Sequence, residues 1–567
     1  MRLTATIAAA AVTAGLLTLT GVPARAADVE VSPEDLRFHQ HHLRYGSPRQ
    51  ADLLAEPIRQ MSGDLRSFLD PSPDHPMYAG GVVLASRHGV IAVHDAAGKA
   101  VRYADPATEL PAAQQVPVRR DTIFDLASVT KTFTTIAVLQ QVEAGRIGLD
   151  EPVATYLPAF AARGKDDVTI RYLLTHTGGL PAWVPLYSRY PTVEERLAAV
   201  LDVAPTAEPG AAYVYSDLGL ITLGLVVEAV TGQPLDAVIA TGITRPLRMR
   251  DTMFNPPPHL VDRIAATEAQ PWAGRPMIRG EVHDENAWSL GGVAGHAGLF
   301  STAHDLGILA RTLLNGGRYG RARILDDDTV RAMLVNENAA FPGDSHGLGF
   351  ELDQRWYMDG LSTPVTFGHT GFTGTSVVID PLSDSFVVLL TNRVHPTRDW
   401  GGNNPARRAV ARDLARALAV RPLEGRRAWF SGVGDARTPV LSAPVTSGGL
   451  LSFGLWYDTE ADSDVLTLEA STDGGASWSP VPFSLQSGAE SVETDGSVSG
   501  FGGRRWHHAA AALPAADGSS GVVLVRWRYA NDALYQGRGV YVDRVRVDDA
   551  RIDDSLFTAD GWAPSPD

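Results

Sequence analysis

The sequence contains no cysteine among its 567 residues. A disulfide framework, thiol catalysis and a lipid anchor on an N-terminal cysteine are therefore excluded. Lysine is nearly as scarce: Lys99, Lys131 and Lys165 are the only three, against 46 arginines among the 49 residues of these two types. A lysine gives up its proton when it is buried near other charges, whereas an arginine effectively does not. A lysine retained in such a chain is therefore a candidate for proton chemistry.

Positive charge is also in short supply, because the formal net charge is −16. This balance argues against nucleic acid or an anionic membrane surface as the main partner. The composition, with 44% hydrophobic and 20% charged residues, is ordinary for a globular protein. The length predicts at least two domains with cores of their own.

A long apolar run occurs only at the start, in "MRLTATIAAAAVTAGLLTLTGVPARAADVE". Its basic beginning, apolar centre and small-residue "ARA" predict a secretory signal over residues 1–26, cleaved near Ala26, and hence a secreted protein. A membrane-spanning helix is the weaker interpretation, because the run is short and helix-ending residues follow it. No later segment is apolar enough to span a membrane.

The order of the expected elements suggests a sheet that is built from both ends of residues 27–425. The spacing of apolar residues predicts helices over 51–69 and 405–419, and the alternation predicts strands over 80–98 and 375–393. An apolar helix ends at Gly145, and a mostly helical, loop-rich segment follows to about residue 350. We expect the two end helices on one face of the sheet and the middle segment on the other.

From residue 428 to 567 the pattern changes to short strands separated by Gly, Ser and Asp turns. This pattern predicts an all-β sandwich with its own core. Within it, "STDGGASW" (471–478) matches the Asp-box hairpin. Because it occurs once, we interpret it as a structural turn and not as a propeller repeat.

Lys131 stands three residues after Ser128 at the start of the apolar helix. Residues at this spacing share one helix face, so the two side chains can touch. The helix N-terminus adds positive potential where an oxyanion would form. A Ser-x-x-Lys pair also arises by chance, and Lys131 could be a surface charge, so the pair alone is only suggestive.

Two further motifs carry candidate groups. Tyr215 and Asp217 stand at a loop-to-helix junction, where a phenol beside a lysine could accept a proton from a serine. The alternative is a core tyrosine followed by Ser216 or Asp217 as a helix cap. Later, "GHTGFTGTS" places His369, Thr370, Gly371 and Phe372 before a strand, where small residues allow close approach of a substrate. Its alternative is a glycine-rich turn with an incidental histidine.

In this order the three motifs resemble the serine β-lactamase and penicillin-binding protein superfamily, most of all its class C β-lactamases, D-aminopeptidases and related esterases. The framing phrases "LLTHTGGLPAW", "PGAAYVYSD" and "HGLGFEL" agree, and the resemblance covers about residues 40–420. It implies an α+β fold, an antiparallel sheet flanked by helices with an inserted helical region, ahead of the all-β sandwich. It also implies that Ser128 is acylated, that Lys131 and Tyr215 share the acid–base work, and that the N–H groups of Ser128 and Phe372 form the oxyanion hole.

Two departures from the family pattern bear on the chemistry. The second motif usually ends in Asn, and here Asp217 can pair with Lys131 and favour its charged form. We therefore favour Tyr215 over Lys131 as the proton acceptor. The third motif usually begins with Lys, which helps to hold a substrate carboxylate, whereas His369 is neutral or only partly charged near pH 7. This weakens the case for penicillin hydrolysis or D-Ala-D-Ala trimming without excluding either.

The phrase "RGEVHDENAWSLGGVAGHAGLFSTAHDL" (279–306) resembles a subgroup that includes exported N-acetylmuramoyl-L-alanine amidases. We interpret its "HDEN" (283–286) as a polar loop lining the cleft, because adjacent residues do not converge on one ion without a special turn. In "FHQHH", His39, His41 and His42 could bind metal, but a solvated arm is the favoured interpretation. No cofactor and no catalytic metal are expected.

Together these observations predict an exported serine hydrolase that acts through an acyl-enzyme, most simply on amide or peptide bonds of peptidoglycan fragments. An esterase or β-lactamase acting on small molecules is the alternative. A catalytically silent cell-wall-binding protein is the rival from another class, disfavoured because Ser128, Lys131 and Tyr215 are all present. The C-terminal part resembles jelly-roll modules of secreted peptidases. Such modules often bind surfaces or glycans, here glycan or cell wall, and some hold calcium, for which Asp532 and Asp543 are candidate ligands. A stabilising spacer is the alternative.

Overall fold

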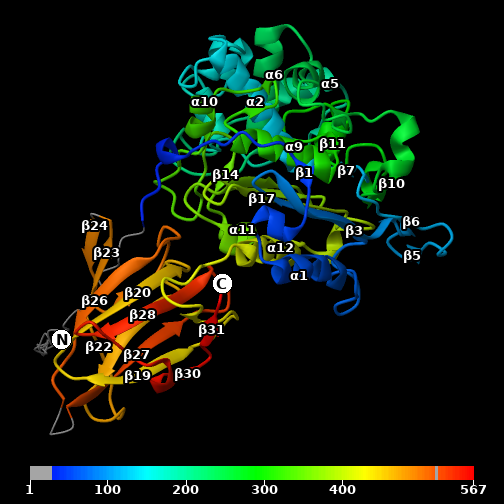
Figure 1. Ribbon diagram of the computed structural model, residues 1–567. Coiled ribbons are helices and arrows are strands. Elements are labelled where there is room, and N and C mark those ends of the chain that lie inside the picture. Colours follow the sequence, from blue (N-terminus) through cyan, green and yellow to red (C-terminus); the bar gives the residue numbers. More distant parts are fainter. Residues whose placement is uncertain (1–28, 489, 517–520) are drawn as a thin grey trace, which may run out of the picture.

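A sheet of eight strands, antiparallel in all pairings but that of β1 with β3, forms the centre of the N-terminal part of the molecule (Figure 1). The computed structural model describes residues 29–488, 490–516 and 521–567, so the predicted signal, residues 1–26, lies outside the described residues. The strand order is β1-β3-β2-β17-β16-β15-β14, with β6 beside β3. The bounds are Arg44–Tyr45 (β1), Gly80–Arg87 (β2), Val90–Val101 (β3), Val116–Pro117 (β6), Glu351–Leu352 (β14), Phe367–Thr370 (β15), Ser376–Asp380 (β16) and Ser385–Thr391 (β17). The expected sheet from both ends is confirmed.

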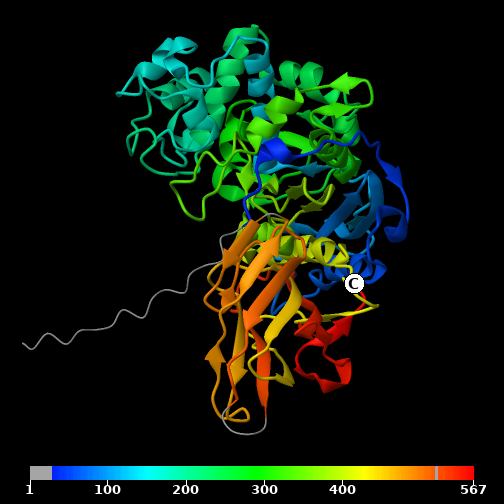
Figure 2. The ribbon, with the colours of Figure 1, turned by 60° about the vertical axis from the view of Figure 1, so that its left-hand side comes forward.

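The two end helices, α1 (Ala55–Ser67) and α12 (Asn404–Ala417), pack against each other on one face of this sheet. In α1, Ile58, Met61 and Leu65 recur at three- and four-residue spacing and are all buried. That apolar stripe is why this segment is helical and why it lies on the sheet. In Figures 1 and 2 both helices lie between the sheet and the C-terminal sandwich.

The middle of the chain covers the other face. Helix α9 (Ala303–Leu314) lies directly on β2 and β17, and α2 (Thr130–Glu143) packs against α6 (Asp217–Thr231) above it. The other helices of this segment are α3 (Ile170–Leu174), α4 (Leu186–Arg189), α5 (Val193–Asp202), α7 (Leu235–Ile239), α8 (Glu285–Ser289) and α10 (Asp327–Met333), whereas α11 (Arg355–Met358) packs on α12. The placement of this segment opposite the end helices agrees with the prediction.

Among the described residues, no single helix is both long and apolar enough to cross a membrane. Helix α6 and the segment Leu235–Thr244 meet that test only as a pair, and the two are bent by 79° against each other. Most of α6 is buried in the core.

The C-terminal part is a sandwich of two antiparallel sheets. One has the order β24-β23-β26-β20-β28-β18-β31 with β29 beside β28, and the other β22-β21-β27-β19-β30 with β25 beside β21. The longest strands are Val440–Thr446 (β19), Leu450–Asp458 (β20), Val465–Ser471 (β21), His507–Ala512 (β26), Val522–Ala530 (β27) and Gly539–Val547 (β28). The shorter ones are Ala428–Phe430 (β18), Ser479–Pro480 (β22), Ser484–Ser487 (β23), Glu490–Glu493 (β24), Ser497–Val498 (β25), Ala550–Arg551 (β29), Thr558–Asp560 (β30) and Ala563–Ser565 (β31).

Alternation along the strands builds the core of this sandwich. In β27 every second side chain is buried, with Trp527 fully enclosed between the sheets. The "STDGGASW" segment forms the turn from β21 to β22, where the Asp473 carboxylate accepts hydrogen bonds from Ser471 and Ser477. Its structural role is the one the sequence suggested.

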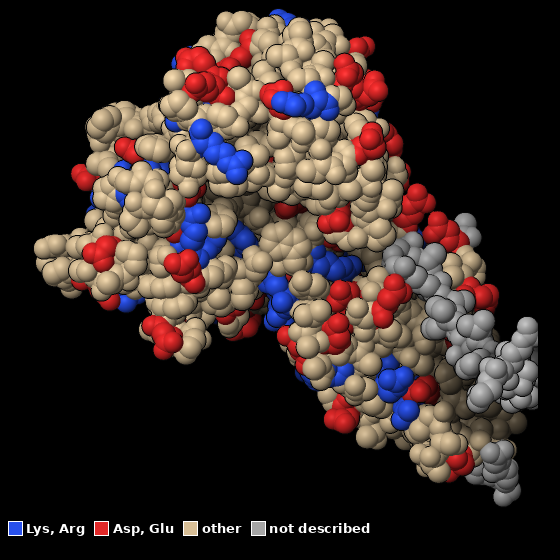
Figure 3. Space-filling model, turned by 180° about the vertical axis from the view of Figure 1, so that it is seen from behind, with Lys and Arg blue, Asp and Glu red and all other residues tan. Residues whose placement is uncertain are grey.

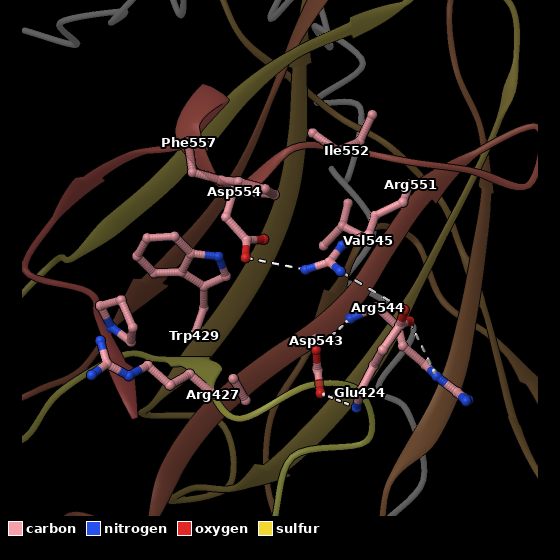
Figure 4. A pocket seen from close by; sticks show the side chains of 12 residues that line it. Glu424, Arg427, Trp429, Asp543, Arg544, Val545, Arg551, Ile552, Asp554 and Phe557 are labelled. Carbon is pink, nitrogen blue, oxygen red and sulfur yellow. Dashed lines mark hydrogen bonds and ion pairs between the residues drawn. The ribbon is translucent and has the colours of Figure 1, made fainter. Parts of the chain in front are cut away.

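The segment that joins the two parts is fixed to β28. Asp543 Oδ2 accepts the N–H groups of Leu423 (2.7 Å) and Glu424 (3.0 Å), and Glu424 pairs with Arg546 (2.8 Å). Figure 4 shows Asp543 and Glu424 side by side in a pocket there. Asp543 therefore anchors the connection, whereas Asp532 lies with Glu460 and Asp464. The two candidate calcium ligands belong to different groups, and the exact domain limits stay a prediction.

A second tie between the parts runs through one arginine. Arg504, from the loop before β26, lies 2.6 Å from Asp380 Oδ2 at the end of β16 and 3.0 Å from Asp458 Oδ2 at the end of β20. Its guanidinium also donates to the carbonyls of Gly360 (3.2 Å) and Leu361 (3.0 Å). Arg504 thus pairs with one carboxylate from the sheet of each part, and both ion pairs are buried.

Candidate active site

Ser128 lies in a short 3-10 turn, Ala127–Val129, that leads from strand β7 (Phe124–Asp125) directly into α2. Ala127 adopts a φ of 48°, which is uncommon for a residue with a side chain, and donates its N–H to Asp125 Oδ1 at 2.8 Å. This bend leaves Ser128 half-buried, at the border of a cavity. Lys131, one turn later, brings its Nζ to 3.0 Å from Ser128 Oγ.

Lys131 is 1% exposed and is surrounded by partners for its charge. Its Nζ lies 2.8 Å from Asp217 Oδ1, donates to the carbonyl of His296 at 3.2 Å, and sits 4.8 Å from the centre of the Tyr215 ring. Burial by itself would lower the pKa of Lys131, but the charge of Asp217 and the phenol of Tyr215 outweigh it and leave the pKa raised. Lys131 is therefore an ammonium at neutral pH.

Tyr215 stands just before α6, with its ring beside the Lys131 ammonium, and lines the same cavities as Ser128. Burial raises its pKa, Lys131 lowers it and Asp217 raises it, and the net pKa lies above the ordinary value. Lys131 does lower the pKa of Tyr215, as the sequence suggested, but burial and Asp217 raise it by more. Ser216 precedes the helix without a capping bond, because its Oγ donates to the carbonyl of Pro181 instead.

The third motif forms the end of β15 beside Ser128. His369 is 1% exposed, and burial, with Lys131 and Arg407 nearby, lowers its pKa to about 3, so it is neutral and brings no charge to the cleft. At Gly371 a Cβ would lie 2.1 Å from Thr375 Oγ1 and 2.3 Å from the carbonyl of Leu126. Only glycine lets β15 come this close to the turn that carries Ser128.

Phe372 follows directly, with a side chain that is 47% exposed and borders the cleft. Among the described residues, neither its N–H nor that of Ser128 takes part in a turn, loop or cap hydrogen bond. Two free donors beside one hydroxyl are what an oxyanion hole requires. The structure thus brings Ser128, Lys131, Tyr215, Asp217 and the third motif together.

Two cavities, of about 390 and about 480 Å³, meet at Ser128, Tyr215 and Phe372. These volumes fall in the range of small-molecule sites. The first is walled by aromatic and charged groups from loops and short helices, namely Trp183, Tyr187, Trp272, His283, Asp284, Glu285, His296 and Arg398. The second is lined by polar and basic groups of the sheet edge and α12, including Tyr213, Glu351, Trp356, Arg393, Asn403 and Arg407.

The "HDEN" segment borders the first cavity as predicted, but only His283 and Asp284 lie in a loop, because α8 begins at Glu285. Glu268 Oε2 lies 2.8 Å from His283 Nε2 and 2.7 Å from Arg398, which also pairs with Glu285 at 2.7 Å. Burial alone would raise the pKa of Glu268, but hydrogen bonds from His283 and Arg398 hold it at about 2. Arg398 lies over the rings of Trp272 and Phe372, so this ion network supports the cavity wall.

Asp284 and His296 form the part of the wall nearest Lys131. Asp284 Oδ1 is 2.9 Å from His296 Nε2 and also accepts the N–H of Ala287 at the start of α8. Together with Asp217 they are close enough to hold an ion, but Asp217 is already paired with Lys131. The arrangement favours proton chemistry over metal binding.

Several cleft residues carry no sequence signal. Arg393 follows β17. Arg407 lies in the amphipathic helix α12, and the apolar stripe of that helix accounts for the sequence pattern without any functional role for Arg407. Glu351 is the first residue of β14, and nothing in the local sequence marks it as functional. Burial nevertheless raises its pKa to about 7. Only the fold brings these groups to Ser128. Figure 3 shows, on one face of the molecule, basic side chains gathered around a hollow near its middle.

The fold and this constellation define a serine hydrolase with a β-lactamase and transpeptidase-like architecture. Residues 65–412 match the family model described as "Beta-lactamase", and the chain belongs to that family. The protein is 34% identical over 395 residues to a "Putative D-alanyl-D-alanine carboxypeptidase" of Salmonella schwarzengrund, a match that covers 62% of this chain and 86% of the relative. A protein of the same name from Escherichia coli is 34% identical over 387 residues, with the same coverage.

Among solved structures, a penicillin-binding protein homologue from Caulobacter crescentus superimposes with a TM-score of 0.51 at 21% sequence identity. The match covers 65% of this chain and 97% of that one. At this identity the likeness concerns the fold. The similarity of about two thirds of the chain leaves the C-terminal sandwich as an addition to the shared architecture.

Proposed function

We propose that this serine hydrolase cleaves peptide bonds of peptidoglycan fragments through an acyl-enzyme on Ser128, with release of a C-terminal D-alanine as the first candidate reaction. The names of the two relatives support the substrate class. The observation that carries the proposal is a pair of arginines, Arg393 and Arg407, in the cavity beside Ser128.

Neither arginine has a carboxylate partner among the described residues. Arg393 donates to the carbonyls of Phe372 and Gly401, and Arg407 to those of Gly371 and Thr375. Burial lowers the pKa of both to about 10, so both stay charged at neutral pH. Glu351, with its pKa raised to about 7, neutralises Arg407 only in part, and Glu268, which interacts with Arg393, is already bound by His283 and Arg398. Cations without a carboxylate partner of their own favour a substrate carboxylate, the role that the neutral His369 does not fill.

In the proposed reaction Tyr215 first gives its phenolic proton to solvent, and Ser128 Oγ then attacks the carbonyl and passes its own proton to the phenolate oxygen of Tyr215. Lys131, held charged by Asp217, stabilises the phenolate and keeps Ser128 in position. The N–H groups of Ser128 and Phe372 hold the oxyanion. Tyr215 then returns the proton to the leaving amine, and water releases the acyl group by the reverse path.

Amide hydrolysis between muramic acid and the peptide is a second candidate, because "HDEN" and the three aromatic side chains Trp183, Tyr187 and Trp272 line the other cavity. Flat aromatic walls suit a sugar ring or a peptide plane. The proposal extends to an exported protein, as the signal pattern predicts, and to contact of the sandwich with cell-wall glycan. The pocket of about 280 Å³ around Trp429 and Phe557 supports that contact (Figure 4).

Mass spectrometry of a panel of muropeptides, incubated with wild type, with Ser128→Ala and with Ser67→Ala, tests the proposal. Ser67 is an exposed serine at the end of α1 and serves as the matched control. Loss of one alanine from pentapeptides with wild type and Ser67→Ala, but not with Ser128→Ala, supports the carboxypeptidase. Loss of the whole peptide supports the amidase. If no fragment changes while a small ester or β-lactam is hydrolysed, the substrate proposal fails, and inertness toward all of them favours the silent binder.

A further inference from the structure

Three segments that are distant in the sequence meet at one edge of the central sheet. His41 comes from the N-terminal arm (residues 29–43), His88 from the turn between β2 and β3, and Asp384 from the turn between β16 and β17. Asp384 Oδ2 lies 2.9 Å from His88 Nδ1 and 3.5 Å from His41 Nε2. All three candidate ligand atoms lie within 4.8 Å of one another.

We propose that His41, His88 and Asp384 form a binding site for a divalent transition-metal ion, with Zn²⁺ the best match. In a tetrahedral zinc site each ligand lies about 2.0–2.1 Å from the metal, so two ligand atoms are about 3.3 Å apart. The two distances from Asp384 Oδ2 lie on either side of this value. The two histidine nitrogens lie within 4.8 Å of each other, so side-chain rotations that bring them closer would place the three atoms around one ion.

The surrounding contacts hold these ligands in place. Asn315 fixes the arm on both sides of His41, because its Oδ1 accepts the His41 N–H (3.2 Å) and its Nδ2 donates to the His41 carbonyl (2.9 Å). The next part of the arm pairs with the turn that carries His88, through the N–H of Arg44 and the carbonyl of Gly89 (2.9 Å). Arg311, fully buried in α9, binds the other oxygen of Asp384. Partners of this kind orient ligands in metal sites.

The balance of charge decides which ion fits. Arg311 already neutralises Asp384, so one carboxylate is too little for Ca²⁺ or Mg²⁺, which need several oxygen ligands. Two imidazoles suit Zn²⁺, Co²⁺ or Ni²⁺. The side chains of His41 and His88 are 36% and 41% exposed, which leaves room for a water as the fourth ligand.

The arm is thus more than the solvated segment that "FHQHH" suggested. Only His41 turns toward the cluster, whereas His42 packs edge-on against Tyr319 with the ring centres 5.2 Å apart. A bound ion would join the arm to two hairpin turns of the sheet. Figure 1 shows the arm, in dark blue, running from the sandwich to β1 at this edge. The site is independent of the proposed reaction at Ser128.

The test uses the whole chain without a polyhistidine tag, stripped with EDTA and then titrated with ZnCl₂ by calorimetry and with CoCl₂ by visible absorption. We expect one equivalent of either metal, and a rise of the melting temperature with Zn²⁺ but not with CaCl₂. His88→Gln and His41→Gln should each weaken binding at least tenfold, because even outer partners of a ligand contribute about 10- to 100-fold. The double variant should not bind.

His42→Gln is the matched control, since it makes the same change one residue away on the same arm and outside the cluster. It should bind Zn²⁺ as wild type does. The melting temperatures of all variants in EDTA show whether the fold is intact, and because His88 lies on an exposed turn we expect them to agree. Absence of stoichiometric binding by wild type, or the same affinity in a folded double variant, would overturn the proposal.

Discussion

Asp217 Oδ1 lies 2.8 Å from Lys131 Nζ, at the bottom of the cleft and beside Ser128. The family motif that the sequence resembles usually ends in asparagine at this position, and an amide carries no charge. Here the carboxylate raises the pKa of Lys131 against the effect of burial. In the proposed reaction the lysine therefore acts as a fixed positive charge, and the proton of Ser128 goes to Tyr215.

Replacing Asp217 by asparagine should shift the pH dependence of the reaction. Asp217 raises the pKa of both Lys131 and Tyr215, so its removal lowers both. Because the deprotonated base is the active form, a lower pKa moves the rising limb of kcat/KM to lower pH, by about one unit or more. The profile of kcat/KM against pH for wild type and Asp217→Asn measures this. An unmoved limb would mean that the base does not sense Asp217, and Asp202→Asn, at an exposed surface pair, is the control.

Lys131→Arg keeps the positive charge but should lower kcat by at least about 100-fold, the lower end of what positioned acid–base groups contribute. The side chain of Lys131 is enclosed, and the space around its end fits a compact ammonium but not a planar guanidinium. Single-turnover kinetics with a chromogenic ester separates acylation from deacylation. Lys99→Arg, at a partly exposed strand position, makes the same exchange and should leave both rates unchanged. A rate near that of wild type in Lys131→Arg would refute the role of Lys131.

Arg393→Gln should discriminate between substrates that end in a carboxylate and those that end in an amide. A hydrogen bond to a charged group contributes about 1.5–3 kcal/mol, so KM for the free acid should rise about tenfold or more. KM for the amidated peptide should change little. A loss that is equal for both substrates would instead indicate that Arg393 acts by holding the Phe372 carbonyl, with which it hydrogen-bonds at 2.9 Å.

Arg504→Met should destabilise the whole molecule. It leaves Asp380 and Asp458, both buried, without their cation, and breaking a buried pair costs about 3–5 kcal/mol. Urea unfolding followed by fluorescence measures the change. Arg505→Met removes the neighbouring arginine, whose pairing with Glu490 is exposed, and should cost less than about 1 kcal/mol. Equal stability of the two variants would show that Arg504 does not join the two parts.

The sequence predicts the local elements well where one physical rule dominates. The stripe of Ile58, Met61 and Leu65 predicts α1, although the predicted helix begins four residues early because Pro48–Ala51 forms a separate turn. The "RHG" turn between β2 and β3 lies where alternation and glycine place it. Ser128 and Lys131 could be paired from their spacing alone, because three residues in a helix fix the geometry.

What the sequence by itself determined is therefore the family, the layers of the fold, and the residues that one helix or one motif brings together. The tertiary structure decided the electrostatics of the cleft. Arg393, Arg407 and Glu351 reach Ser128 only through the packing of the sheet edge and α12, and burial, which sets the pKa values of Tyr215 and His369, has no local signature. The tertiary structure also decided that His41, His88 and Asp384 meet. Contacts between distant segments depend on how the sheet is assembled, and the periodicity of a sequence carries information only about neighbouring residues.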